Sequence, residues 1–85
     1  MELRQVEAFL EVANKGSFVE AARVIHVTQP SLSARIRGLE QELGTELFYR
    51  LSKGVTLTDV GRIFLPYAEK VVDTLRQADI AIRDS

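Results

Sequence analysis

The chain has 85 residues, with 11 Lys and Arg, 12 Asp and Glu, one His, no Cys and a formal net charge of −1. This length allows one small domain, which buries about 60–65% of the surface that its unfolded form exposes. The absence of Cys excludes disulfides, thiolate metal sites and a Cys nucleophile, and a single His excludes a His-rich metal site.

The first 25 residues predict two helices separated by a short stop. Apolar residues recur at helical spacing from Leu3 to Ala13, and Asn14-Lys15-Gly16 ends that run. Ser17-Phe18-Val19-Glu20 has the spacing of a capping box, in which Ser17 and Glu20 each bond the other's backbone N–H. A second, short helix is therefore expected to follow Ser17 and to end near Ile25.

A third helix follows after a turn of only two residues, His26-Val27. Thr28 is its expected cap, and Pro30 suits its first turn because a Pro there lacks only an N–H that would be unpaired anyway. The following Gly44 is a plausible stop. The buried stripe of this third helix has apolar residues at intervals of four, three and four, namely Leu32, Ile36, Leu39 and Leu43.

Two short β-prone runs, residues 47–50 and 55–58, predict a hairpin whose loop is residues 51–54. An isolated two-stranded hairpin is barely stable in water, so it must pack on the helices. Its tip carries Arg50, Ser52 and Lys53 beside Gly54. Such a tip could contact DNA phosphates or be an ordinary solvated turn.

The last predicted helix runs from Thr58 to the end of the chain. Pro66 lies inside it, so the helix either kinks there or restarts just before it. The apolar stripe could pack on the chain's own core, but it extends about four turns beyond Tyr67 at ~3.6 residues per turn. Pairing with a second copy is therefore expected. The stripe has the a/d spacing of a coiled coil and consists of Phe64, Ala68, Val71, Leu75, Ala78 and Ile82.

The net charge conceals two basic segments. Residues 21–39 contain three Arg and no acid, and residues 47–58 contain Arg50 and Lys53 and no acid. A binding face needs only local charge, although such segments by themselves are more often solvated surface.

Capped helices joined by a tight turn, with a basic outer face on the second helix, indicate a helix-turn-helix. The side chains off its buried stripe suit base edges and phosphates, since Gln bonds adenine, Arg bonds guanine or phosphate, and Pro or Ala meets a thymine methyl. An ordinary helical bundle or a protein-interaction module is the alternative. An enzyme is disfavoured, because Glu40 and Glu42 do not share a helix face and the glycines form no phosphate loop. The candidate readers are Gln29, Pro30, Ser31, Ser33, Ala34 and Arg37.

A spaced set of residues along the whole chain resembles the DNA-binding end of the LysR-type transcriptional regulators. The set includes Met1-Glu2-Leu3-Arg4-Gln5, Gly16-Ser17-Phe18, Val27-Thr28-Gln29-Pro30-Ser31-Leu32-Ser33, Leu43-Gly44, Leu47-Phe48 and Leu57-Thr58. The resemblance implies a mainly α winged helix-turn-helix, with three helices and a two-stranded β-wing, followed by a long dimerisation helix. We therefore expect a DNA-binding domain at residues 1–57 and a linker helix at residues 58–85.

The resemblance also implies roles for individual residues. Base reading falls to Gln29, Pro30, Ser31 and Ser33, backbone contacts to Thr28, Arg37 and Arg4, and wing contacts to Arg50, Ser52 and Lys53. Many relatives carry Arg where this chain has Ala34, and a basic residue where it has Gly38. Ala34 removes a possible guanine contact, which Arg35 could partly replace from a different direction around the helix.

The same resemblance implies partners and a setting. Its members are bacterial and bind an interrupted palindrome of double-stranded DNA as homodimers, and a tetramer of the full-length protein is left open. A larger domain that senses a small-molecule effector is expected to be missing from this chain, because the last helix still runs at Ser85. No cofactor or metal is expected. No apolar run approaches the ~18 residues of a membrane span and no basic signal region opens the chain, so we expect a cytoplasmic protein without membrane contact.

Overall fold

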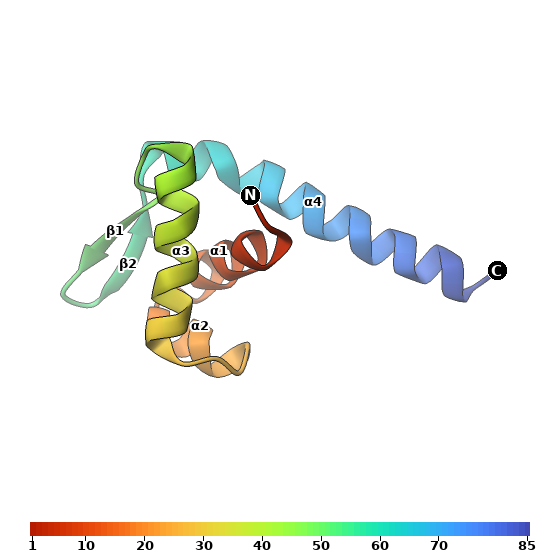
Figure 1. The fold of residues 1–85 in the computed structure, drawn as a ribbon, viewed down its shortest axis with the longest axis horizontal. Helices are drawn as coiled ribbons and strands as arrows, with labels where there is room; N and C mark the ends of the chain where they lie inside the picture. The colour runs from red at the N-terminus through yellow and green to blue at the C-terminus, as the bar shows by residue number, and fades with distance from the viewer.

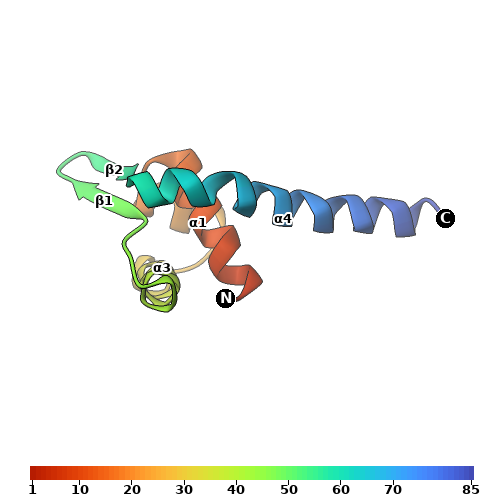
Figure 2. The same cartoon turned by 90° about the horizontal axis from the view of Figure 1, so that it is seen from above.

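The computed structural model describes residues 1–85 and confirms a mainly α fold with one two-stranded sheet. The elements are α1 (Leu3–Lys15), α2 (Phe18–Val24), α3 (Gln29–Leu43), β1 (Phe48–Leu51), β2 (Gly54–Leu57) and α4 (Asp59–Arg83). The first three helices cluster together, the hairpin projects from one side of them, and α4 extends away as a long arm (Figure 1). The view from above shows the hairpin and α3 on the same side of the molecule, opposite the free end of α4 (Figure 2).

The core is centred on the ring of Phe9, which α1 places between the sheet and α4. Its centroid lies 5.2 Å from the ring of Phe48 on β1 and 4.9 Å from the ring of Phe64 on α4. The apolar stripe of α3 closes the other side and matches the predicted stripe, except that Leu43 is partly exposed. Most of the core therefore comes from helix faces that the apolar spacing identifies, namely Val6, Phe9, Val12, Leu32, Ile36 and Leu39.

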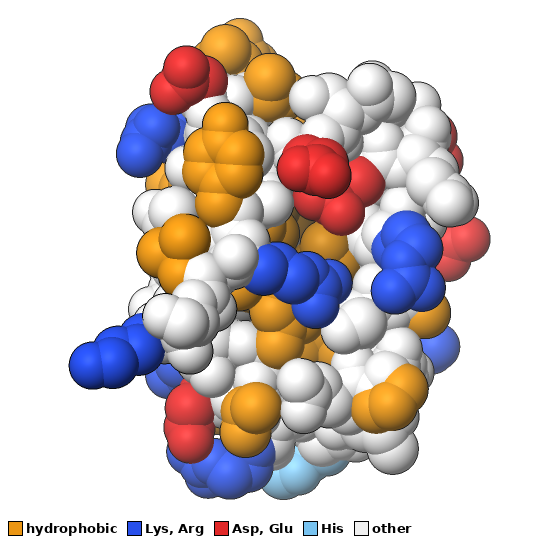
Figure 3. Space-filling model, turned by 90° about the vertical axis from the view of Figure 1, so that its left-hand side faces the viewer, with side chains coloured by type: hydrophobic (Ala, Val, Ile, Leu, Met, Phe, Trp, Pro, Cys, Tyr) orange, Lys and Arg blue, Asp and Glu red, His pale blue; other side chains and the backbone are white.

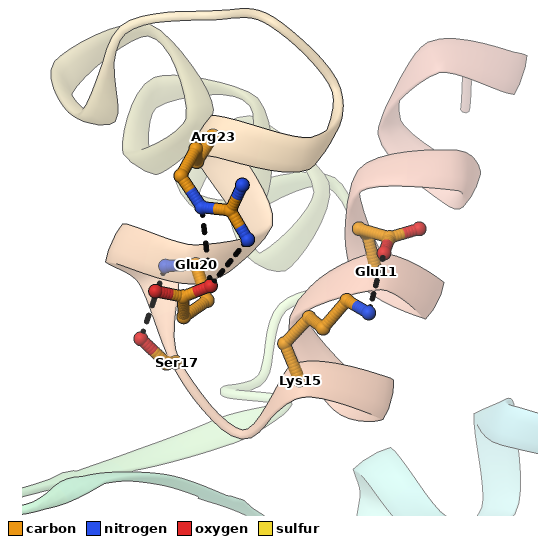
Figure 4. Close-up of polar contacts among 5 residues, drawn as sticks. All are labelled: Glu11, Lys15, Ser17, Glu20 and Arg23. Atoms are coloured by element: carbon orange, nitrogen blue, oxygen red, sulfur yellow. Dashed lines mark hydrogen bonds and ion pairs between the residues drawn. The ribbon is translucent and has the colours of Figure 1, made fainter.

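Side-chain oxygens cap three of the helices, as the sequence predicts for two of them. Ser17 Oγ accepts from the Glu20 N–H at 3.2 Å, and Thr28 Oγ1 accepts from the Ser31 N–H at 3.2 Å. The second half of the expected capping box at Ser17 does not form. The Glu20 carboxylate instead pairs with Arg23 at 2.9 Å, one turn further along α2 (Figure 4). An oppositely charged partner three residues away competes for the carboxylate.

The first strand of the hairpin begins and ends one residue later than predicted, and the second strand begins and ends one residue earlier. Phe48 pairs with Leu57 and Leu51 pairs with Gly54, so Ser52 and Lys53 form a two-residue turn rather than part of a four-residue loop. Thr58 is not a strand residue because it caps α4, its Oγ1 accepting from the Gly61 N–H at 3.0 Å. The left-handed backbone of Gly54, with φ of 105°, lets the strands pair up to the turn.

A junction around Leu47 joins α3, the hairpin and α4. The Leu47 N–H donates to Glu40 Oε2 of α3 at 2.7 Å, and the Leu47 carbonyl accepts from the Thr58 N–H at 3.0 Å. Thr58 Oγ1 also donates to the Glu46 carbonyl at 2.8 Å. Gly61 of α4 packs directly on the Leu47 carbonyl, where an added Cβ would lie only 2.3 Å from the oxygen.

The long helix α4 continues without a restart through Pro66, so of the two alternatives for this residue the restart is wrong. Its first half packs on the chain's own core, since Ala68 is 1% exposed and Phe64 contacts Phe9. The expectation that Ala68 pairs with a second copy is therefore wrong, while Phe64 is only partly buried and its pairing stays a prediction. None of the helices combines the length and hydropathy that crossing a membrane requires.

We expect Gly61→Ala to destabilise the fold, although Ala is favoured over Gly in a helix by about 1 kcal/mol. The added methyl would meet backbone at the Leu47 junction, where relief requires movement of β1 or α4. The net loss should be about 1–3 kcal/mol, measured as a lower melting temperature by circular dichroism. Glu69→Ala, at an exposed position of the same helix, is the control and should stay within about 0.5 kcal/mol of the parent. An unchanged melting temperature for Gly61→Ala would contradict the packing described.

Candidate nucleic-acid interface

The first turn of α3 presents a row of small and polar side chains to solvent. Its buried stripe faces the core, so the opposite side of the helix is free. Ser33 is half-buried, while the other members of the row are exposed. The Thr28 cap leaves the backbone N–H groups of this turn at a helix N-terminus, where anions are favoured. The exposed members are Thr28, Gln29, Pro30, Ser31 and Ala34.

The two remaining candidates on α3, Arg37 and Arg35, lie on different sides of the helix. Arg37 is exposed and lies four residues from Ser33, on the same row of the helix as the reading residues. Arg35 lies on the row of Gly38 and Glu42, which faces α1. An added Cβ on Gly38 would lie 3.1 Å from Gln5 Nε2, and Glu42 pairs with the Met1 amino group at 2.5 Å. Arg35 is half-buried and lies four residues from Ser31, between the first turn of α3 and this side, and Gly38 has a packing role there.

The wing is held against the helices on its β2 side. The Val55 N–H donates to the Gly16 carbonyl at 3.0 Å, in the turn between α1 and α2. A Cβ on Gly54 would lie 2.5 Å from that same carbonyl, so the close approach requires glycine. This contact leaves Ser52 and Lys53 exposed at the hairpin tip.

Arg50 does not belong to the hairpin tip, contrary to the sequence-based grouping. It lies two residues beyond the buried Phe48 on β1, so the two side chains point to the same face of the strand. That face is turned toward the helices. The guanidinium carbon of Arg50 lies 4.1 Å from the centre of the Phe18 ring of α2, within cation–π distance.

A hollow of about 480 Å³ separates α3 from the inner face of the wing. Phe18, Ile36 and Phe48 provide its apolar lining, Arg50 lies beside it, and Glu40 and Glu46 also border it. Figure 3 looks onto this face and shows hydrophobic side chains at the bottom of the hollow, with Lys and Arg side chains across it and on both sides. Acidic side chains gather toward its upper part in the same view.

The basic side chains of this face have no acidic partner within the chain. All five ion pairs of the structure involve other residues, which leaves the charges of Arg37, Arg50 and Lys53 available to an anionic ligand. Arg4 is also exposed and unpaired, but it lies on α1. No cluster of His, Cys, Asp and Glu side chains could hold a metal ion.

Sequence reasoning missed two contributors to this face, Phe18 and Gly16. Phe18 lies in the first turn of α2, where its hydrophobicity predicts burial but not the cation placed over its ring. Gly16 reads as a helix stop, and its carbonyl anchors the wing. The local signal that could have pointed to Arg50 is strand alternation with Phe48. No local pattern predicts that Phe18 contacts Arg50 or that Gly16 bonds Val55.

Comparisons with known proteins agree with this geometry. Residues 3–62 match the family model described as bacterial regulatory helix-turn-helix protein, lysR family. An HTH-type transcriptional regulator of Azotobacter vinelandii, from the ibpB-leuC intergenic region, is 43% identical over 99% of this chain and 58% of its own length. The regulator GltR of Bacillus subtilis is 38% identical over 100% of this chain and 29% of its own length. The chain thus spans less than two thirds of these relatives, which are transcriptional regulators rather than enzymes.

Solved structures show the same fold. The BenM DNA-binding domain in complex with catB site 1 DNA superposes with a TM-score of 0.93 and 37% identity, covering 99% of this chain and 93% of that one. The CbnR DNA-binding domain in its DNA complex gives a TM-score of 0.90 and 33% identity, covering 99% and 97%.

Proposed function

The chain belongs to the lysR family of bacterial regulatory helix-turn-helix proteins, and we propose that it binds double-stranded DNA as the sequence-reading part of a dimeric transcription regulator. The observation that carries this proposal is the capped, exposed first turn of α3 beside a wing whose basic side chains have no acidic partner. Related domains of the same fold are found in DNA complexes.

Base reading is assigned to the first turns of α3, inserted into the major groove. Gln29 can make two hydrogen bonds with adenine, and Ser33 can donate or accept on the same helix row. Pro30 and Ala34 offer methyl-compatible surface to thymine. Arg35, half-buried and four residues from Ser31, lies at the edge of this set. The base-reading set is Gln29, Pro30, Ser31, Ser33 and Ala34.

Phosphate contacts are assigned to groups that surround the reading turn. Thr28 and Arg37 flank it on α3, Ser52 and Lys53 reach the neighbouring backbone or minor groove from the wing tip, and Arg4 adds a contact from α1. These contacts set the position and register of the domain without reading sequence. They also make the affinity dependent on salt, because each neutralised phosphate releases counterions.

We assign residues 1–57 to DNA binding and residues 58–85 to a linker helix that pairs two copies. The pairing surface we propose consists of the exposed apolar positions beyond the core, Val71, Leu75, Ala78 and Ile82. Two paired domains would bind the half-sites of an interrupted palindrome. The regulator would act in the bacterial cytoplasm, and effector sensing would fall to a domain outside this chain.

Titration of mixed-sequence duplex DNA at several salt concentrations tests the proposal. A DNA-binding domain should show saturable binding, and the logarithm of its association constant should fall linearly with the logarithm of the salt concentration. Lys53→Ala should weaken all sequences about equally and reduce that slope by about 0.9 for the lost phosphate contact. Lys70→Ala, an exposed position on α4, is the matched control. Absence of salt-dependent binding by the parent chain would favour a protein-interaction module instead.

Gln29→Ala should relax the preference at one base pair of a site selected from random duplexes, because the bidentate contact with its base is lost. The expected cost on that site is about 1–3 kcal/mol, with little change on mixed-sequence DNA. Competition between the selected site and its single-base variants measures the effect. If the ranking of those variants stayed the same, Gln29 would not be a reader.

Leu75→Asp should shift the chain toward monomer in sedimentation velocity, because it places a charge in the proposed pairing surface. Leu75 is 49% exposed, so the single chain has little packing to lose there. Gln77→Asp adds the same charge to another side of α4 and should leave the assembly unchanged. An unaltered assembly for Leu75→Asp would place the interface elsewhere.

A further inference from the structure

The Arg50 guanidinium is held in place by a ring and yet keeps its donors free. Its central carbon lies 4.1 Å from the Phe18 ring centre, and no hydrogen bond or ion pair engages its nitrogens. A guanidinium that stacks on a ring face keeps its N–H groups in the plane parallel to the ring, where they remain available to another partner. Arg50 is exposed on the face that carries α3 and the wing.

The Phe18 ring that supports this cation is itself fixed. Phe18 is 6% exposed, and its ring meets the Phe48 ring edge-to-face at a centroid distance of 6.1 Å. Its backbone is also set, because it is the first residue of α2 and directly follows the Ser17 cap. Phe48 is in turn packed on Phe9 at the centre of the core. The platform under Arg50 is therefore continuous with the core.

We propose that Phe18 is a positioning residue for DNA binding, holding the Arg50 guanidinium ready for a DNA phosphate in the space between α3 and the wing. This inference rests on the proposed function and adds a residue to it. A planar guanidinium with free N–H groups fits a phosphate in two-point fashion. Ordering a long, flexible side chain before binding removes part of the entropy that association would otherwise cost.

Lys53 provides the internal contrast. It lies at the turn of the same hairpin, three residues beyond Arg50, and no ion pair holds its amine. An ammonium on a flexible stem acts as a point charge, while Arg50 is restrained in direction by the ring. The two wing cations should therefore respond differently when the ring is removed.

The test measures binding of one selected duplex across a salt series for the parent chain and for Phe18→Leu, Arg50→Ala and the double variant. Arg50→Ala should reduce the salt slope by about 0.9, the loss of one phosphate contact. Phe18→Leu keeps a smaller apolar side chain in place of the ring and leaves every charge unchanged, so it should weaken binding about two- to fivefold with the slope unchanged. In the Arg50→Ala background, Phe18→Leu should not weaken binding further, because the guanidinium that the Phe18 ring supports is already absent.

Arg50→Lys supplies a second route if Phe18→Leu reduces the folded population seen by circular dichroism. It keeps the charge but loses the planar stacking, so binding should again weaken about two- to fivefold at unchanged slope. Lys70→Arg, at an exposed position of α4 outside the proposed interface, is the control and should bind like the parent within about twofold. Three results would overturn the inference: an unchanged slope for Arg50→Ala, equal losses from Phe18→Leu in both backgrounds, or parental binding by Arg50→Lys. If the parent chain itself failed to bind DNA, the proposed function would fall instead.

Discussion

The backbone of Leu47 holds together the three parts of the chain on which function depends. Its N–H is tied to Glu40 near the end of α3, its carbonyl to Thr58 at the start of α4, and Gly61 approaches that carbonyl too closely for any side chain. Because the amide is only partly accessible to water, leaving it unpaired would cost about 1–3 kcal/mol. The angle between recognition helix, wing and linker helix is therefore set by one short stretch of backbone.

A cluster of aromatic rings connects the core to the face that carries α3 and the wing. Phe9 packs on Phe48 and Phe64, and Phe48 packs on Phe18, so rings from α1, α2, β1 and α4 share one cluster. Strand alternation then brings Arg50 onto the same side as Phe48, above the Phe18 ring. A small domain has a small core, and here the rings that stabilise the fold also contact the guanidinium of Arg50.

The charge distribution becomes consistent with DNA binding once the fold is considered. The whole chain has a net charge of −1, yet the basic side chains of α3 and the wing have no acidic partner. Several acidic side chains are engaged locally, as Glu20 is with Arg23 and Asp79 with Arg83, each at 2.9 Å. Exposed ion pairs of this kind add little stability and no net charge, so they do not weaken the field at the first turn of α3.

The sequence alone determined the features that depend on neighbours three or four residues away: the helices, the Ser17, Thr28 and Gly44 boundaries, and the exposed first turn of α3. Only the tertiary structure decided which partner each surface meets. It turned Arg50 from the hairpin tip onto Phe18, placed Gly38 against Gln5 of α1, and buried Ala68 in the chain's own core. Helical periodicity reports that a side of an element is apolar, but the partner that covers it comes from contacts between residues far apart in the chain, which no local spacing encodes.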